Sequence, residues 1–432
     1  MLDVIDLCLS QGNRALEDSG EGASQQCRRV AAIGLEVARL SQLPGHFEPL
    51  LERAAILHQF QDFGSSALAR LAAEVGSVDS QPADCPRRAD VANIESILSL
   101  LHGKPAPGAT EHCRHVADIV RMCVALDEHL TAQPLDYQPI DTILDELHSF
   151  AVFEGFNPDL VNCLRQLRYD ILGLSSNWAR LPVQAQTARQ VIRCLGSGQE
   201  CEVGDIEKLA ASDPVMAGAL IQVANSTIYS PLCRISRIRE AVAYMGTAAA
   251  RKVLLAAAVR PLFASGGLRR LWTHSLQMAQ LCSSLGRQSG IAGPEEGLLI
   301  GLVHDVGSLA VQTLPGTTLQ RYSRLVERGC PPAYVEQVLF GCDHGEIGAA
   351  ILSQWNFPAS TVEAVRFHHQ SERSESPVAA MVYLAEFWSG LEEDLPSFVR
   401  IRECSSRTGI SMESLATAHD RESALSVLRT VA

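Results

Sequence analysis

Apolar residues recur at helical spacing along most of this chain, and this pattern constrains the fold more than any other feature. In residues 27–57 they form two such stretches, separated by Pro44 and Gly45, which predicts a pair of helices. No long stretch alternates between apolar and polar residues as a half-buried strand does. Apolar residues make up 47% of the chain but aromatic residues only 5%, so Ala, Leu, Val and Ile must build the cores. We therefore expect an all-α fold.

A chain of 432 residues is long enough for two or three domains. The helical periodicity breaks in residues 175–184, which include Pro182, and this is the best candidate for a domain junction. We predict two helical-bundle domains, residues 1–174 and 175–395. Residues 396–432 form a C-terminal helical extension that packs on the second domain, and its segment TGISMESLATA resembles the capped start of a helix.

Individual helices are predicted from the same pattern and from capping residues. One helix is predicted to start near Val91, and three others to cover residues 112–130, residues 141–150 and the segment from Asp159 to near Leu174. Two more are predicted to start at Asp205 and at Ser236, and Gly246 closes the second of these. Breaker-rich residues 74–90 and 103–110 are predicted loops. Asn225 and Ser226 end a further helix, where such side chains typically satisfy free backbone carbonyls.

Charge and composition exclude several functions. The formal net charge is −13 and no dense Lys/Arg block occurs, so nucleic-acid binding is not expected as the main role. No apolar run approaches the roughly 20 residues of a membrane span, and the first residues lack the basic region of a signal peptide. The 13 cysteines show no repeated CxxC spacing, as expected for buried thiols in a reducing compartment. We therefore expect a cytoplasmic protein.

Histidines in the second half of the chain lie in or beside apolar helical stretches, together with two acidic residues. Neutral imidazole and carboxylate suit Fe, Mn, Ni or Zn, and a carboxylate next to a histidine can bridge two ions. The adjacent His-Asp pair is the most specific part of this pattern. The candidate metal ligands are His274, His304, Asp305, His344, His368, His369 and Glu386.

Each of these histidines has an alternative interpretation as a buried, hydrogen-bonded core residue. A single histidine on an apolar face is more often of that kind, whereas five together favour an assembled cluster. The sequence leaves open which of His368 and His369 points inward, because neighbouring residues of a helix face about 100° apart.

From about Leu181 to Gly390 the sequence resembles an HDOD domain, a relative of the HD superfamily found in bacterial signalling proteins. The similarity runs through LPVQAQTARQVI, IEKLAASDPVMAGALIQVANSTIYS, ISRIREAVAYMG, WTHS, GLVHDVG, DHGEIGAAILSQWNFP, VRFHH and YLAE. This resemblance implies a helical bundle of HD type and a role in signal transduction.

The resemblance also implies roles for single residues. His274 is similar to the first histidine of the HD pattern, His304 and Asp305 to its doublet, and Glu386 falls where the superfamily usually has a closing Asp. His344, His368 and His369 match the later histidines. In catalytic HD-GYP phosphodiesterases the doublet opens an HDxGK run, whereas this chain has Ser308 in place of the Lys and no GYP segment after the paired histidines. These differences argue against hydrolysis of cyclic dinucleotides.

CRRVAAIGLEVARLSQL followed by ERAAILHQF is similar to the opening of an HD-GYP-like domain, and PIDTILDELHSFAVFEGFNPDLV is similar to its closing stretch. Most of residues 20–165 thus resemble such a domain that has lost its metal chemistry. AAILHQFQDFG at 54–64 is a weak echo of GLVHDVGSLA at 301–310. Cys27 stands where the first histidine would be, and Gln59 replaces the Asp of the doublet, which leaves His58 without the partners that a metal site needs. We therefore predict a packing and interaction module.

Two functions follow from this sequence. The first is a bacterial signal-transduction or regulatory protein whose HDOD domain is a non-catalytic binding or scaffold module. Its partner would be a signalling or regulatory protein, and a nucleotide is a further candidate ligand. The alternative is a metal-dependent phosphohydrolase, a nucleotide or cyclic-dinucleotide phosphodiesterase, in which Asp305 would be the catalytic residue and the cofactor one or two ions of Fe, Mn, Ni or Zn.

Overall fold

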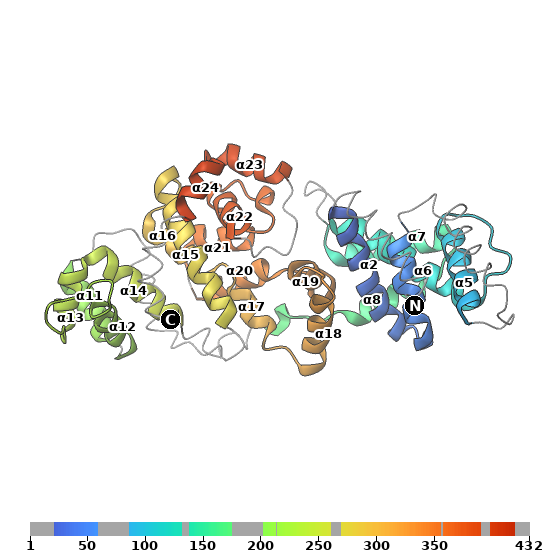
Figure 1. Ribbon diagram of the computed structural model, residues 1–432, viewed down its shortest axis with the longest axis horizontal. Coiled ribbons are helices and arrows are strands. Elements are labelled where there is room, and N and C mark those ends of the chain that lie inside the picture. The colour runs from blue at the N-terminus through green and yellow to red at the C-terminus, as the bar shows by residue number, and fades with distance from the viewer. Residues whose placement is uncertain are drawn as a thin grey trace. The chain divides into compact units, whose positions relative to one another are not determined.

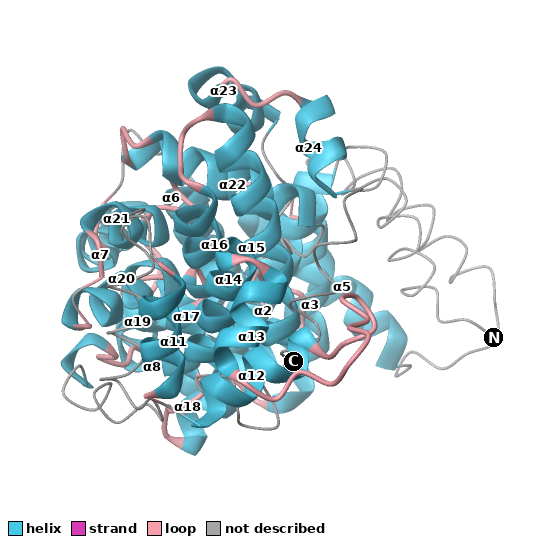
Figure 2. Cartoon of the chain, turned by 90° about the vertical axis from the view of Figure 1, so that its left-hand side faces the viewer, coloured by secondary structure: helices cyan, strands magenta, loops and turns pink. Residues whose placement is uncertain are grey.

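The computed structural model describes residues 21–58, 86–131, 138–174, 202–212, 214–260, 269–355, 357–389 and 398–419. Helices dominate all of these segments, and none of them contains a strand (Figure 2). The predicted all-α fold is confirmed. The helices form two compact units: one contains the chain up to Tyr169 together with Gly316–Gly341, and the other contains Asp170–Pro315 and the chain from Cys342 onward.

The first unit is built around two long helices, α2 (Glu21–Leu40) and α6 (Glu111–Thr131), which pack on each other. Helices α3 (Glu48–Leu57) and α5 (Pro86–Leu101) pack against α6 and against one another. Helices α7 (Ile140–Glu154) and α8 (Asp159–Leu167) also contact α6. The short 3-10 helix η1 (Gly45–Phe47) follows Pro44, so the predicted interruption between the first two helices is confirmed.

Two further helices of the first unit come from much later in the sequence. They are α18 (Gly316–Glu327) and α19 (Pro332–Phe340), and residues 316–341 are called the α18–α19 arm below. The backbone N–H of Tyr169 donates to the carbonyl oxygen of Leu339 at 2.7 Å, and Arg321 donates to the carbonyl oxygen of Leu167 at 3.5 Å. The arm is thus joined to the segment that follows α8.

The second unit begins with a small helical bundle (Figure 1). It consists of α11 (Val203–Ala211), α12 (Pro214–Ala224), α13 (Ile238–Met245) and α14 (Thr247–Val259). The Asn225 amide donates to the carbonyl oxygens of Ile221 and Ile235 at 2.8 and 2.7 Å, which confirms the predicted role of this side chain at the end of α12.

The rest of the second unit surrounds the pair α15 (Arg269–Ser289) and α16 (Pro294–Val303). Helix α17 (Val306–Val311) packs on α20 (His344–Gln354), which packs on α21 (Ala359–Arg366). The 3-10 helices η3 (Leu172–Leu174) and η5 (Ser371–Arg373) are also part of this unit. Helix α22 (Pro377–Ser389) contacts α15, and its apolar side chains form a buried core cluster with those of α15.

The C-terminal helices α23 (Phe398–Thr408) and α24 (Met412–His419) pack on this same core. Ile401 and Cys404 of α23 and Leu415 of α24 are buried in it. The Arg407 guanidinium donates to the carbonyl oxygens of Ser371 and Ser374 and so fixes α23 to the segment before α22.

Two element boundaries were predicted wrongly. Helix α8 ends at Leu167 and not near Leu174, because the backbone of Arg168 is extended. Helix α5 begins at Pro86, inside the predicted loop 74–90, since proline is well tolerated in the first turn of a helix. The predicted junction at 175–184, Gln59 and Asp213 lie outside the described residues. The domain boundaries 1–174, 175–395 and 396–432 stay predictions.

Among the described residues, no single helix has both the length and the apolar composition needed to cross a membrane. Helices α13 and α14 meet that criterion only when counted as one segment, and they are bent by 119° at the break between them.

Candidate metal centre

Two glycines of α16 allow this helix to lie backbone against backbone with α15. A Cβ at Gly297 or at Gly301 would overlap main-chain atoms of α15, so no larger residue fits at these positions without a shift. Helix α15 carries His274, and α16 ends immediately before His304. The close approach of the two helices therefore brings these histidines together.

A third glycine acts in the same way between α17 and α20. A Cβ at Gly307 would overlap the carbonyl oxygen of His344, the first residue of α20. The start of α20 is fixed by Asp343, whose carboxylate accepts a hydrogen bond from the backbone N–H of Glu346 at 2.9 Å. His344 is thereby held beside Asp305, which directly precedes α17.

Three of the predicted ligands form a first group of facing side chains. The Nε2 atom of His274 lies 3.1 Å from Nε2 of His304 and 3.1 Å from Oε1 of Glu386. The Nε2 atom of His304 lies 3.3 Å from Oε2 of the same carboxylate. All three side chains are buried, and they come from α15, the end of α16 and α22.

A second group consists of the three remaining histidines. The Nε2 atoms of His344 and His369 face each other at 2.7 Å. The ring of His368 lies 5.3 Å from that of His344 and 4.0 Å from that of His369, measured between centroids. His368 is fully buried and His369 is half-buried, so both of the paired histidines belong to this group.

Asp305 lies between the two groups, with one carboxylate oxygen toward each. Its Oδ2 atom is 3.3 Å from Nε2 of His304 and 3.5 Å from Nε2 of His274. Its Oδ1 atom is 3.2 Å from Nε2 of His344 and 3.7 Å from Nε2 of His368. The structure therefore brings all seven residues singled out by the sequence into one cluster, called the histidine cluster below.

Backbone hydrogen bonds fix the orientation of two of these imidazoles. Nδ1 of His304 lies 2.9 Å from the carbonyl oxygen of Gly301, and Nδ1 of His368 lies 2.7 Å from that of Val365. A carbonyl oxygen can only accept, so each Nδ1 carries the hydrogen and each Nε2 is turned into the cluster. Histidines that bind metals are commonly oriented by this kind of second hydrogen bond.

The charge balance of the histidine cluster calls for a cation. Among the described residues, every ion-pair partner of Asp305 and Glu386 is a histidine. Burial by itself would lower the pKa of His304, but the two carboxylates outweigh burial and raise it to about 10. In return the histidines hold the pKa of Asp305 well below its ordinary value, against the opposing effect of burial. Without a metal, a proton on His304 thus balances part of the carboxylate charge.

A second observation also indicates that the histidine cluster fits a metal ion. Nε2 of His368 is buried and has no hydrogen-bond partner, which is costly for a polar atom in a protein interior. Burial, followed by repulsion from His344 and His304, lowers the pKa of His368 to about 4, so this nitrogen offers a free lone pair at neutral pH. Imidazole nitrogens and carboxylate oxygens are the donor atoms that divalent Fe, Mn, Ni and Zn prefer.

Comparison with known families decides the identity of this region. Residues 181–371 match the model of the HDOD domain family. This chain contains an HDOD domain. The matched range includes six residues of the histidine cluster, and Glu386 follows it on α22.

Two solved structures are similar to about three fifths of this chain. An HDOD domain protein of unknown function from Geobacter sulfurreducens is 25% identical, with a TM-score of 0.50, over 60% of this chain and 96% of that one. A putative phosphohydrolase from Shewanella amazonensis SB2B is 21% identical, with a TM-score of 0.49, over 60% of this chain and 98% of that one.

A curated relative is also similar to part of the chain. It is an uncharacterized protein of Treponema pallidum (strain Nichols), 26% identical over 174 residues. The aligned region covers 39% of this chain and 34% of that protein, so this chain spans about a third of the length of its relative.

The sequence analysis missed the residues that hold the HDOD histidines in place. Gly301 and Val365 supply the carbonyl acceptors, each three residues before the histidine it orients. Gly297 and Gly301 permit the helix contact, and their spacing of four places them on one face of α16. That spacing, seen next to an HD doublet, is the signal from which this contact could have been predicted.

Proposed function

We propose that this chain is a regulatory protein whose HDOD domain binds a divalent metal ion at the histidine cluster and acts as a binding module without turnover. The observation that carries this proposal is the pair of buried carboxylates, Asp305 and Glu386, which face histidines on all sides. His274, His304 and Glu386 would hold one ion, and His344, His368 and His369 would hold another, with Asp305 between them.

The non-catalytic role is inferred from the surroundings of the doublet. Ser308 is half-buried on α17, at the position where HD-GYP phosphodiesterases have a lysine, and its backbone N–H donates to the carbonyl oxygen of Asp305 at 3.0 Å. A serine at this position gives a bound phosphate no cationic partner. A protein partner in signalling, or a nucleotide that binds without being hydrolysed, is the expected ligand of such a module.

Elemental analysis tests the proposal most directly. The chain purified without added chelator is expected to carry roughly one to two equivalents of Fe, Mn, Ni or Zn. The variant His304→Ala/Asp305→Ala should lose this metal, and His46→Ala, which removes an exposed histidine of the first unit, should keep it. Equal metal contents in all three samples, or no metal in any of them even after incubation with Zn²⁺ or Mn²⁺, would refute the proposal.

A second candidate function is favoured by one specific observation. The two oxygens of Asp305 face separate groups of potential ligands, as in a site for two ions. Bound ions would supply an activated water and would neutralise charge on a phosphoryl group. This alternative is a phosphohydrolase acting on a nucleotide or cyclic dinucleotide, in which Asp305 would orient the ions and His304 would hold one of them.

Turnover separates the two functions. With Mn²⁺ or Fe²⁺ supplied, bis(p-nitrophenyl) phosphate and a cyclic dinucleotide are suitable probes. A hydrolase would lose turnover in Asp305→Asn while its melting temperature stayed close to that of the unmodified chain. A binding module would show metal loading and no turnover, and a signalling partner would then be sought by pull-down with the metal-loaded chain as bait.

A further inference from the structure

Two residues of the histidine cluster, Asp305 and His344, are joined by a stretch of chain that belongs to the first unit. Asp305 precedes α17 and His344 begins α20, and these two helices pack directly against each other. The intervening chain does not stay in the second unit. It forms the α18–α19 arm, which packs within the first unit, and it returns at Cys342.

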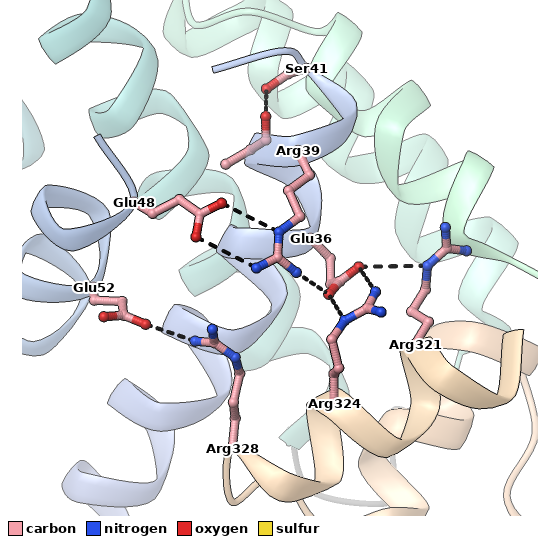
Figure 3. Close-up of polar contacts among 9 residues, drawn as sticks. Glu36, Arg39, Ser41, Glu48, Glu52, Arg321, Arg324 and Arg328 are labelled. Atoms are coloured by element: carbon pink, nitrogen blue, oxygen red, sulfur yellow. Dashed lines mark hydrogen bonds and ion pairs between the residues drawn. The ribbon is translucent and has the colours of Figure 1, made fainter. Parts of the chain in front are cut away.

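A buried carboxylate of the first unit holds α18. Glu36 of α2 is only 5% exposed. Its two oxygens accept from Nε and Nη2 of Arg324 at 3.1 and 3.0 Å, and Nε of Arg321 lies 3.6 Å away (Figure 3). Arg39 of α2 donates to the same carboxylate at 2.9 Å. Removing this one negative charge would leave three guanidinium groups close together.

Further contacts hold the turn after α18 and the start of α19. Arg328 donates to Glu52 of α3 at 2.7 Å (Figure 3). Tyr334 of α19 is buried, and the guanidinium of Arg29 lies 5.3 Å from the centre of its ring. The arm is therefore fixed to α2 and α3 at several points along its length.

The end of the arm tolerates only a glycine. Gly341 closes α19 with a φ of +75°, a conformation that other residues rarely adopt. A Cβ at this position would also approach Arg168 and Ile140 to 2.6 and 2.7 Å. The next residues, Cys342 and Asp343, lead directly into His344.

From this arrangement we propose that the first unit positions Asp305 and His344 through the α18–α19 arm and thereby controls the affinity of the histidine cluster for metal. The inference rests on the proposed metal binding. The arm is held by Glu36 near its start and by the hydrogen bond from Tyr169 to Leu339 near its end, and each end leads to a helix that carries or adjoins a ligand. A molecule that displaces α2 or the end of α8 would move these anchors and weaken metal binding.

The test uses the full chain with Zn²⁺ as the probe. Glu36→Gln removes the charge that holds α18 while preserving the size of the side chain. We expect its zinc affinity to fall about threefold to tenfold, the range typical of coupling through a packed element. The control Asp145→Asn breaks the ion pair of α7 with Arg165, which lies in the same unit but off the arm, and should change zinc affinity by less than about twofold.

Charge reversal at a second ion pair, Glu52 and Arg328, distinguishes a loss of positioning from a loss of folding. Glu52→Arg and Arg328→Glu should each weaken zinc binding, and the double variant, which restores the ion pair with opposite polarity, should recover it. A purely structural role would lower the melting temperature in these variants without changing the zinc affinity.

A readout without metal keeps this inference separate from the proposed function. Hydrogen exchange of backbone amides in α17 and α20 of the metal-free chain should speed up in Glu36→Gln and stay unchanged in Asp145→Asn. Zinc affinity and exchange that both stay at the level of the unmodified chain in Glu36→Gln would overturn the inference. If the unmodified chain binds neither Zn²⁺ nor Mn²⁺, the proposed function fails, whereas the exchange experiment still decides whether the arm positions α17 and α20.

Discussion

Buried carboxylates in the two units are neutralised in different ways. In the first unit Asp127 of α6 is fully buried, and both of its oxygens accept from Arg29 of α2, at 2.7 and 3.1 Å. In the second unit Asp305 and Glu386 are paired only with histidines among the described residues. An arginine is a permanent cation built into the fold, whereas histidines balance a carboxylate only by taking up a proton or by sharing a metal.

One cysteine of the first unit, Cys27, supports this contrast. Burial, followed by the charge of Asp127, raises the pKa of Cys27 to about 12, so its thiol stays protonated at neutral pH. A protonated thiol is neither a metal ligand nor a nucleophile. Its Sγ lies 3.5 Å from the carbonyl oxygen of Ile56, as a weak donor would. The comparison therefore indicates that a charged site is closed by arginine in the first unit and is available to a metal in the second.

The largest expected effect comes from breaking the ion pair between Arg29 and Asp127. Arg29→Ala leaves the carboxylate of Asp127 buried without its cationic partner and should lower the free energy of unfolding by about 3 to 5 kcal/mol. Urea unfolding of the full chain, followed by circular dichroism and by hydrogen exchange in α2 and α6, measures this loss. Arg29→Met/Asp127→Leu removes both charges and should recover most of the stability. If the single variant were as stable as the unmodified chain, the ion pair would not be what neutralises this site.

A smaller effect is expected where the second unit brings its histidines together. Gly301→Ala places a methyl group against the backbone of α15 and should destabilise the chain by about 1 to 3 kcal/mol. Because α16 must then move away from α15, the variant should also lose metal at His274 and His304. The matched control is Gly218→Ala on α12, where a Cβ would meet no atom within 4 Å, and which should stabilise the chain by up to about 1 kcal/mol.

Equal stabilities of Gly301→Ala and Gly218→Ala would mean that α15 and α16 can separate without cost. The helix contact would then not be what holds the histidine cluster together, and the contrast between the two units would rest on their charged side chains alone.

The sequence predicted the histidine cluster better than it predicted the route of the chain. The periodicity of apolar residues marks helices independently of their neighbours, and each of these histidines lies in or beside such a helix, so a cluster could be expected. The side of Asp305 on which each histidine lies could not, because it depends on packing permitted by Gly301 and Gly307. The arm was missed for a similar reason. Its attachment to the first unit depends on Glu36 and Arg324, which are 288 positions apart and carry no local signal.

The two units are also expected to differ in the sign of their pH dependence. Burial lowers the pKa of His58 below its ordinary value of 6.5, despite the hydrogen bond of its Nδ1 to the carbonyl oxygen of Ala55 at 2.6 Å. The unfolded chain therefore takes up a proton at this position at a higher pH than the folded chain. The associated stability is present above pH 6.5 and is lost as the pH falls below that value.

His304 behaves in the opposite way when no metal is bound. Its pKa is raised from 6.5 to about 10, so its stabilising contribution is complete below pH 6.5 and disappears as the pH rises toward 10. Urea unfolding of the chelated chain at pH 5.5, 7 and 9, compared with His58→Gln and His304→Gln, separates the two contributions. His58→Gln should remove part of the loss between pH 7 and 5.5, and His304→Gln part of the loss between pH 7 and 9. The same pH profile in all three proteins would contradict the contrast, since both histidines would then titrate as they do in the unfolded chain.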